Sequence, residues 1–463
     1  MKVIQKPNNA RGTRDFGPKE MALRNHVFSI IKGHFEAFGF QTIETPAMEN
    51  LSVLTGKYGD EGDQLLFKII NSGDYLSKVS PETIAAGSKA LLPHISEKGL
   101  RYDLTVPFAR FVAMNRNEIA FPFRRSQIQP VWRADRPQKG RYREFYQCDA
   151  DIIGSDSLVN EAELIALFQS VFTSLNLPTN LIINSRKILA GIVDRLGASE
   201  LFVSFAVAID KLDKVGWDAV AEELAQNGFQ VDQIASLQKL FIFEGSNADK
   251  IFLLTEFFAS NALGSEGLSE IQTVLSLADL NGFDNTNLIF DYKLARGLSY
   301  YTGLIYEGKA ADLPFGSIVG GGRYDNLTEA FGLPNMSGVG ISFGIERILD
   351  VMRELNLFPE IQMSASKILF TYFDAKGQEI ALKICNQLRK ENIPSEVYPD
   401  IAKIKKSFEF ADRKGIPFVG VFGEQEIKDG TVSLKDMKNG EQRVLSISEL
   451  LLVFLRNYRQ ALY

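Results

Sequence analysis

The stretch Asp291–Gly303 combines residue types that a surface loop or a buried strand would not normally use together. Its sequence, DYKLARGLSYYTG, sets Arg296 beside Gly297 and follows them with Tyr300 and Tyr301. A buried arginine needs a partner for its charge, whereas a solvated loop has no need of two phenols. The pattern therefore indicates a functional site.

Four further stretches carry charged groups or glycines at suggestive spacings. They are RYDLTVPFAR (101–110), RADRPQKGRYREF (133–145), GGGRYDNL (320–327) and GIERI (344–348). GGGRYDNL lacks the GxxxxGK[ST] spacing of a P-loop, so by itself it could be a tight turn. RYDLTVPFAR could be a surface hairpin, and the arginine-rich stretch could be a solvated charge run. Each is weak alone, and only their order along the chain is specific.

Periodicity predicts the elements that position these residues. The pattern favours an amphipathic helix over 18–40 and a strand over Gln41–Thr45 that ends at Pro46, since proline cannot donate to a ladder. An antiparallel hairpin is predicted over 120–155, with a basic turn at its tip. The remaining predictions are a helix over 158–175, a mostly helical region over 187–285, and a strand running into a helix over 338–355.

The last hundred residues form a second pattern. From Lys367 onward, strands at 367–373, 394–399, 416–423 and 431–437 alternate with helices at 375–393 and 403–415. This alternation predicts an independent α/β domain of about 95 residues.

Composition excludes several classes of protein. The 463 residues suffice for about three domains, and no stretch approaches the ~20 apolar residues of a membrane helix. Cys148 and Cys385 are far apart, and His26, His34 and His94 do not form a metal-spacing cluster. With no secretory signal visible, we expect a cytoplasmic protein without a membrane partner or a protein-held metal. The net charge of −6 means that a nucleic-acid partner would need a local basic surface.

Taken together and in order, these stretches resemble the three signature motifs of class II aminoacyl-tRNA synthetases. LARGLSYYTG (294–303) and RGTRDFGP (11–18) resemble the histidyl-tRNA synthetases, and the resemblance covers essentially the whole chain. It implies an α+β fold with an antiparallel sheet flanked by helices, a mostly helical insertion and a C-terminal α/β anticodon-binding domain. The implied boundaries are 1–186 and 286–360 for the catalytic domain, 187–285 for the insertion and 367–463 for the anticodon-binding domain.

The resemblance implies histidine–tRNA ligase activity: histidine and ATP form histidyl-adenylate, and the histidyl group then passes to tRNA. The carboxylate and the phosphate are both anionic, so cations must hold them together. Arg133 matches the arginine on the α-phosphate, Arg347 the one near the γ-phosphate, and Arg296 a cation across the α-phosphate. Phe145 matches the ring that stacks on adenine, and Arg141 is assigned to ATP as well. ATP would bring its own Mg2+.

The histidine pocket follows from the same resemblance. Asp103 and Thr105 match the contacts to the α-amino group, with Gln147 beside them, and Leu104 is assigned to the same histidine pocket. Asp151 and Tyr301 match the residues that hold the two ring nitrogens, and Tyr300 lines the pocket. A site that hydrogen-bonds the ring rejects apolar analogues, because its own polar groups would be left unpaired.

Contacts with histidine tRNA are expected in two places. The motif-two loop carries Arg136 and Lys139, and the last domain carries Lys405, Lys406 and Arg413. The second group contacts the RNA backbone near the anticodon in one interpretation, and is a solvated helix face in the other. Motif one, ending at Pro46, implies a homodimer.

One alternative and two departures stay open at this point. Catalytically inactive relatives serve as a regulatory subunit or as a sensor of uncharged tRNA, but here Arg133, Arg296 and Arg347 are all present. Ser299 stands where many members have Asp, and Asp151 stands where some have Glu.

Overall fold

The structure is a computed structural model of the whole chain, and it describes residues 6–55, 64–138, 140–283, 287–295, 300–359 and 364–460. The chain divides into two compact units. The first comprises Met1–Asp15 with His26–Leu357, and the second comprises Phe16–Asn25 with Phe358–Tyr463. In the described residues, no helix combines the length and the apolarity that crossing a membrane requires.

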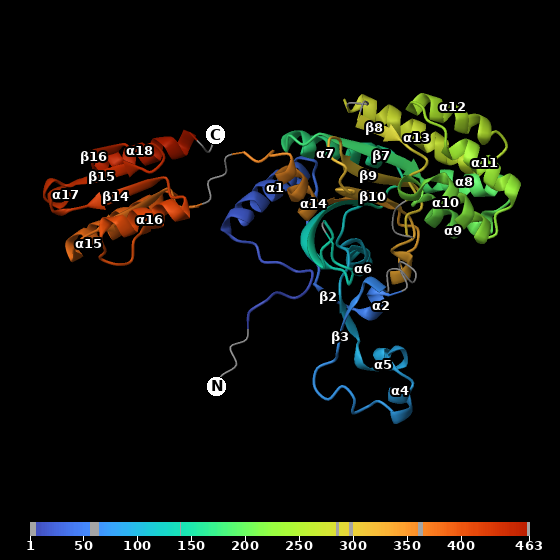
Figure 1. Ribbon diagram of the computed structural model, residues 1–463, viewed down its shortest axis with the longest axis horizontal. Helices are drawn as coiled ribbons and strands as arrows, with labels where there is room; N and C mark the ends of the chain where they lie inside the picture. The colour runs from blue at the N-terminus through green and yellow to red at the C-terminus, as the bar shows by residue number, and fades with distance from the viewer. Residues whose placement is uncertain are drawn as a thin grey trace. The chain divides into compact units, whose positions relative to one another are not determined.

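The described part of the first unit is organised around an eight-stranded sheet (Figure 1). Its order is β1 (Gln41–Thr42), β5 (Phe123–Trp132), β6 (Glu144–Ile153), β11 (Gly338–Gly344), β10 (Val319–Tyr324), β9 (Leu304–Ala310), β7 (Thr179–Ser185) and β8 (Leu288–Phe290). Neighbours from β5 to β7 are antiparallel, whereas β1 and β8 are parallel edge strands. The predicted hairpin over 120–155 is confirmed as β5 and β6.

Helices cover one face of this sheet. Phe343 on β11 contacts Phe35 of α1 (Pro18–Ala37) and Phe172 of α7 (Val159–Ser174), with ring centroids 6.0 and 5.9 Å apart. The residues of β6 that point the same way, Cys148, Ala150 and Ile152, are fully buried. α14 (Ile345–Glu354) follows β11 directly, as the strand-to-helix pattern over 338–355 predicts.

One salt bridge ties the helix layer to the sheet. Arg323 on β10 makes a bidentate contact with Glu161 on α7, at 2.5 and 2.6 Å, and both side chains are buried. GGGRYDNL is therefore part of a central strand, so its reading as a tight turn is wrong.

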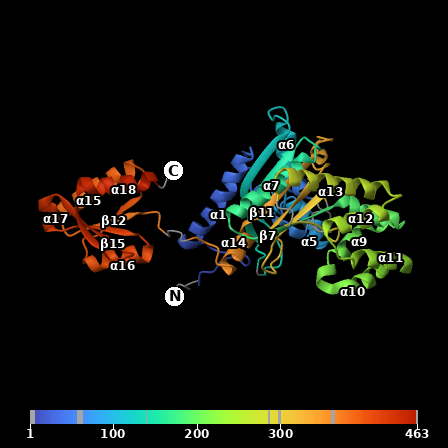
Figure 2. The same cartoon turned by 90° about the horizontal axis from the view of Figure 1, so that it is seen from above.

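The region 187–285 is helical, as predicted. It contains α8 (Arg186–Arg195), α9 (Phe202–Ile209), α10 (Leu212–Gln226), α11 (Val231–Phe241), α12 (Asn247–Phe257) and α13 (Ala262–Leu280). Figure 2 shows α9 to α12 gathered at one end of the unit. Gly191 and Gly264 let α8 and α13 approach closely, because a Cβ on Gly191 would lie 2.5 Å from the Cα of Gly264.

A small sheet precedes the hairpin in sequence. It pairs β2 (Met48–Asn50), β4 (Lys98–Leu100) and β3 (Phe67–Ile69), and the chain between β3 and β4 carries α4 (Pro81–Ala85) and α5 (Ser88–Ile95). RYDLTVPFAR then enters α6 (Thr105–Asn115), whose first turn is buried, so the surface-hairpin interpretation is wrong. Pro107 is tolerated because the first turn has no intrahelical use for its missing N–H.

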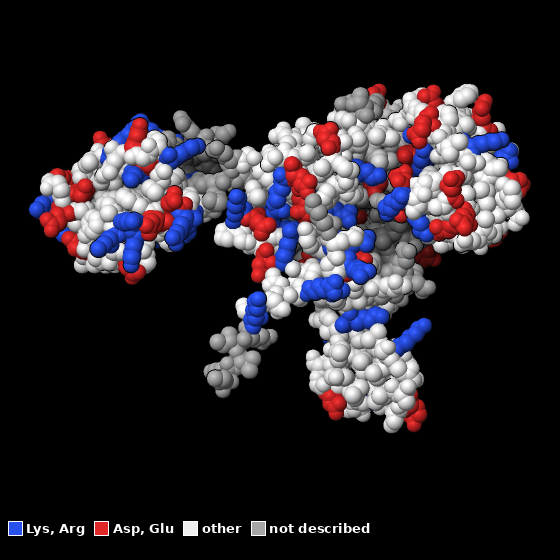
Figure 3. All heavy atoms as spheres, in the orientation of Figure 1, with Lys and Arg blue, Asp and Glu red and all other residues white. Residues whose placement is uncertain are grey.

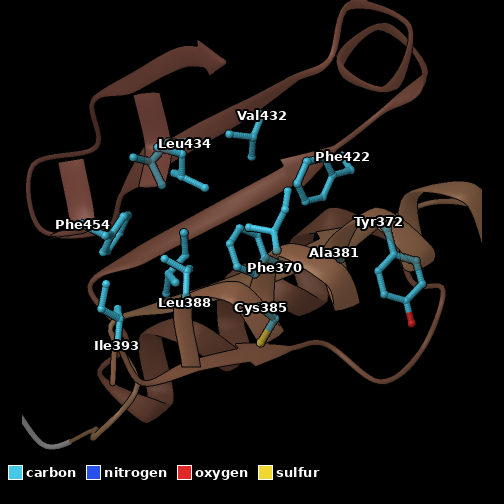
Figure 4. Close-up of a cluster of buried hydrophobic side chains, with 13 residues drawn as sticks. Phe370, Tyr372, Ala381, Cys385, Leu388, Ile393, Phe422, Val432, Leu434 and Phe454 are labelled. Carbon is cyan, nitrogen blue, oxygen red and sulfur yellow. The ribbon is translucent and has the colours of Figure 1, made fainter. Parts of the chain in front are cut away.

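The second unit is an α/β domain with the sheet order β13 (Ser395–Val397), β12 (Ile368–Tyr372), β14 (Phe418–Phe422), β15 (Thr431–Asp436) and β16 (Gln442–Ser446). Its helices are α15 (Ala375–Lys390), α16 (Ile404–Lys414), α17 (Glu424–Asp429) and α18 (Ile447–Gln460). Figure 4 shows the core between the sheet and α15, where Phe370, Cys385, Leu388 and Phe422 point toward one another.

The predicted fold class is confirmed: a mixed α+β catalytic fold and a C-terminal α/β domain. The four-part division of the chain stays a prediction. The strand predicted over Gln41–Thr45 is shorter than expected, since only Gln41–Thr42 pairs with β5. Three elements of the second unit, α17, β16 and α18, were not predicted.

Candidate functional site

A cavity of about 310 Å³ opens on the sheet face opposite α1 and α7. It is lined by nearly all the described residues that the sequence predicts for histidine and ATP. These are Asp103, Thr105, Arg133, Arg141, Phe145, Gln147, Asp151, Tyr300, Tyr301 and Arg347. The predicted residues therefore come together although almost 250 positions separate the first from the last.

The register of the sheet explains how the cavity floor is built. Side chains alternate between the two faces of a strand, so residues two apart share a face and pair in rows with their neighbours. The first row is Arg125, Asp151, Gly340 and Gly322. The second row is Gln127, Asp149, Ser342 and Gly320. Polar groups thus come from β5 and β6, and β10 and β11 contribute mostly bare backbone.

The glycines in the first row leave room for functional side chains. A Cβ on Gly340 would lie 2.0 Å from Oδ1 of Asp151, and one on Gly322 would lie 2.9 Å from the ring of Tyr301. Gly320 is different, because a Cβ there would meet nothing within 4 Å. Glycine is therefore required at 340 and 322 by packing, whereas the space over Gly320 is open to a ligand.

Phenols and a carboxylate line one end of the cavity. The hydroxyl of Tyr324 donates to Oδ1 of Asp151 at 2.7 Å, and the hydroxyls of Tyr300 and Tyr301 lie 3.5 Å apart. The ring of Tyr300 packs edge-on against Tyr324 at 5.9 Å. Burial raises the pKa of Tyr301 and Tyr324, so both phenols stay protonated and can donate.

Two buried hydrogen-bond acceptors of the cavity lining, on Asp103 and Gln147, have no donor among the described residues. Asp103 receives one hydrogen bond, from the amide of Val106, and its Oδ2 is buried without a partner in the described part of the chain. The same holds for Oε1 of Gln147, whose amide group donates to Ser342 at 3.0 Å. Burial raises the pKa of Asp103 to about 7, and Arg133 partly opposes the shift. Buried acceptors of this kind are costly unless a ligand supplies donors.

Cations and one aromatic ring also line the cavity. Arg133 follows β5, donates through Nε to the carbonyl of Tyr102 at 2.9 Å, and lies 5.1 Å from the ring of Phe145. Arg347 stands in the first turn of α14, where the helix dipole favours anions. Its Nε donates to the carbonyl of Gly140 at 2.9 Å and so ties this helix to the hairpin tip.

Arg141 is held less firmly than the other two arginines. Its side chain is half-exposed and lies 3.7 Å from Asp135. Arg136 is exposed on the same loop.

Some predicted residues fall elsewhere. Arg296, Ser299 and Lys139 lie outside the described residues. Leu104 is fully buried and its side chain does not line the cavity, and its carbonyl accepts from Arg125; its assignment to the histidine pocket stays a prediction. Lys405, Lys406 and Arg413 are exposed on α16 of the second unit, where Lys405 lies 3.9 Å from Glu409.

Several site residues escaped the sequence analysis. Arg125, Asp149, Glu307 and Tyr324 line the cavity or its floor. Arg101 is also buried, and it donates to the carbonyls of Thr45 and Pro130, which joins the end of motif one to β5. The signal was the alternation in RSQIQ (125–129) and QCDAD (147–151), where polar residues occupy every second position.

No group of three His, Cys, Asp or Glu side chains in the described ranges could hold a metal ion. Cys148 and Cys385 are buried free thiols.

Comparisons with known proteins agree with this geometry. Residues 96–348 match the family described as histidyl-tRNA synthetase, which is more than half of the chain. The chain belongs to the histidyl-tRNA synthetase family. Residues 366–457 match the family described as anticodon binding domain.

Relatives of this family match over almost their whole length. A histidine–tRNA ligase of Cytophaga hutchinsonii is 51% identical over 448 residues, covering 96% of this chain and 99% of the relative. One of Bacteroides fragilis is 50% identical over 450 residues, covering 97% and 99%. The crystal structure of histidyl-tRNA synthetase from Nostoc sp. PCC 7120 superposes with a TM-score of 0.82 at 28% identity, covering 98% of this chain and 100% of that one.

A more distant structure is described as an ATP phosphoribosyltransferase regulatory subunit/histidyl-tRNA synthetase from Bacillus halodurans. It has a TM-score of 0.69 at 20% identity, covers 88% of this chain and 96% of its own, and shares the fold. The relatives at about 50% identity are all named ligases, so the inactive alternative has no support.

Proposed function

We propose that this chain is a histidine–tRNA ligase. It joins histidine to ATP, giving histidyl-adenylate and pyrophosphate, and then transfers histidine to the 3′ end of histidine tRNA. The observation that carries the proposal is the set of groups that one cavity brings together. Buried acceptors and phenols line it, and so do the cations Arg133 and Arg347.

The cations suit ATP, and the acceptors and phenols suit histidine, in the first step of the reaction. A carboxylate oxygen of histidine attacks the α-phosphorus of ATP, an O–P bond forms, and the bond to pyrophosphate breaks. Arg133 would stabilise the charge on the α-phosphate, and Arg347 would hold the γ-phosphate. Arg296, which lies outside the described residues, is proposed as the cation across the α-phosphate. ATP would carry Mg2+ as part of the substrate, and Phe145 would stack on adenine.

The acceptors and phenols suit the amino acid itself. The free oxygens of Asp103 and Gln147, with Thr105, would receive the ammonium group. Asp151 and the phenol of Tyr301 would hold the two ring nitrogens, and Tyr300 would close the pocket. An apolar analogue would leave these buried groups unpaired, which gives strong discrimination without an editing site.

Contacts with the tRNA are proposed for both units. Arg136 and Lys139 would meet the acceptor end at the hairpin tip, with Arg141 nearby. Lys405, Lys406 and Arg413 would contact phosphates near the anticodon, because they are exposed on one short helix.

We also propose that the chain is a homodimer. Residues 70–94 are all described, and none of them is buried. Ile70, Tyr75, Leu76 and Ile84 expose 40% to 52% of their surface, and Figure 3 shows few charges over α4 and α5. An exposed apolar segment of this kind is typical of a protein–protein interface. A second copy of the chain is the expected partner, because motif one implies a homodimer. Light scattering behind size-exclusion chromatography tests this, with twice the 51.7 kDa chain mass as the expected result.

The localisation follows from the proposed activity. Charging of tRNA for translation places the protein in the cytoplasm, and its two buried free thiols suit a reducing compartment.

Aminoacylation tests the proposal directly. The purified protein, incubated with ATP, labelled histidine and a histidine tRNA transcript, should give acid-precipitable label. A protein that folds and binds tRNA but forms no histidyl-tRNA would contradict the proposal and favour a regulatory or sensing role.

A further inference from the structure

Three charged groups are packed together under the amino-acid pocket. Arg125 is fully buried, and its Nη1 lies 2.9 Å from Oδ2 of Asp151 and 3.7 Å from Oδ2 of Asp149. Both carboxyl groups are only 2% exposed. One guanidinium cannot balance two carboxylates in a site shielded from water, so the second negative charge is unfavourable. The pair therefore tends to retain one proton.

The surroundings of the two carboxyl groups are unequal. Asp151 has Arg125 on one oxygen and a hydrogen bond from Tyr324 on the other, at 2.7 Å. Asp149 is farther from Arg125, at 3.7 Å; the hydroxyl of Ser342 is its other side-chain partner, and its Oδ1 has no hydrogen-bond partner in the described part of the chain. Hydrogen bonds and positive charge favour the ionised form. The proton therefore belongs on Asp149.

Arg125 has little freedom to change this arrangement. Its Nη2 donates to the carbonyl of Leu104 at 2.9 Å, and its guanidinium carbon lies 4.3 Å from the ring centroid of Phe108. The guanidinium is thus clamped between the start of α6 and the cavity floor. This contact gives Leu104 a function through its backbone.

We propose that Arg125 is a positioning residue that keeps Asp151 ionised as the acceptor for the substrate ring and leaves the proton of the pair on Asp149. The proposal rests on the proposed function, since it takes histidine as the ligand. Burial raises the pKa of both carboxyl groups, and Arg125 lowers it again. Asp149 would then be a neutral neighbour, so no second negative charge would repel the carboxylate of Asp151.

Other ionisable groups also act on the pair. The described ionisable groups that face it are Arg125 on β5, Arg101 after β4, Asp103 at the pocket, and the phenols of Tyr301 and Tyr324. Ser342 on β11 is a neutral hydrogen-bond partner of Asp149. Asp103 titrates in the same pH range. The test therefore compares variants that all retain Asp103.

The test uses two isosteric changes and measures histidine-dependent ATP–pyrophosphate exchange across pH. Asp151→Asn removes the ionised acceptor and should lower kcat/KM for histidine about 10- to 100-fold, mainly through KM. Asp149→Asn imitates the protonated form of Asp149, so kcat/KM for histidine should fall by less than about fivefold in this variant. Its acid limb should stay at the wild-type pH, because Asp149 is already neutral at the pH where Asp151 ionises.

Variants of Arg125 complete the experiment. Arg125→Met should move the acid limb to higher pH, because both carboxyl groups lose their counterion, and Arg125→Lys should restore part of the activity. Without Arg125 the proton of the pair can pass to Asp151 and leave the negative charge on Asp149. Adding Asp149→Asn to Arg125→Met removes that alternative, so the double variant should exceed the single one about tenfold or more.

Two results would overturn the inference. One is an equal loss for Asp149→Asn and Asp151→Asn. The other is a loss in Arg125→Met that is the same at every pH and is not relieved by Asp149→Asn. If Arg125→Met fails to fold, Asp149→Asn and Asp151→Asn still test the inference, because asparagine has the shape of aspartate and both variants retain Arg125. A wild-type protein without histidine-dependent exchange would instead refute the proposed function.

Discussion

Replacing Gly340 with alanine should damage the ring end of the pocket without touching the substrate. The new Cβ would lie 2.0 Å from Oδ1 and 2.6 Å from Cγ of Asp151, far inside contact distance. Asp151 cannot yield freely, because Tyr324 and Arg125 hold its two oxygens at 2.7 and 2.9 Å. The carboxylate must therefore leave one of these partners.

The magnitude follows from the interaction that is lost. A hydrogen bond to a charged group contributes about 1.5–3 kcal/mol, which corresponds to roughly 10- to 150-fold in an equilibrium constant. We expect kcat/KM for histidine to fall by that factor, with most of the change in KM, and the KM for ATP to change little. Steady-state ATP–pyrophosphate exchange measures both constants.

A matched control separates the local clash from the chemical change. Gly33 on α1 is exposed, and a Cβ there would meet nothing within 4 Å. Gly33→Ala adds the same methyl group and should leave exchange unchanged while slightly favouring the helix. Gly340→Ala with a normal KM for histidine and normal thermal unfolding would refute the assignment of Asp151 to the ring.

Four further predictions address other parts of the molecule. Glu161→Gln leaves Arg323 buried with an incomplete partner, so the free energy of unfolding should fall by about 3–5 kcal/mol, measured with urea; a loss below 1 kcal/mol would show that the ion pair contributes little. Burial raises the pKa of Asp103 to about 7, and only its ionised form pairs with an ammonium group, so the KM for histidine should rise about tenfold per pH unit below 7 and level off above it; a flat profile from pH 5.5 to 8 would contradict the ammonium contact. Deleting 367–463 should spare exchange and impair tRNA charging, and charging at the full rate would exclude this unit as a tRNA reader. Arg296→Ala should abolish exchange with an unchanged unfolding temperature, and near-normal exchange would remove Arg296 from the mechanism.

Motifs and strong periodicity carried the successful predictions. The hairpin over 120–155, the strand and helix of GIERI, and the helical region over 187–285 each show a regular pattern with clear turn residues. The site residues at 103, 133, 147 and 151 could be placed because they stand in a recognisable order. Their convergence into one cavity depends on the sheet order, which no local pattern contains.

The local sequence led to a wrong interpretation of RYDLTVPFAR and carried no sign of the role of Arg125, in both cases for physical reasons. RYDLTVPFAR contains a proline and charged ends, but Asp103 accepts the amide of Val106 and so starts a helix instead of a hairpin. Arg125 belongs to none of the motifs, so the sequence did not single it out. Only the pairing of 125 with 151 across the sheet shows that it faces a buried carboxylate.

Histidine-dependent ATP–pyrophosphate exchange, assayed with each of the twenty amino acids, tests the central claim most directly. The proposed pocket pairs a buried carboxylate and phenols with a polar ring, and pairs Arg133 and Arg347 with the phosphates. We predict exchange with histidine and none above background with the other nineteen. Exchange with a different amino acid, or with none, would contradict this account.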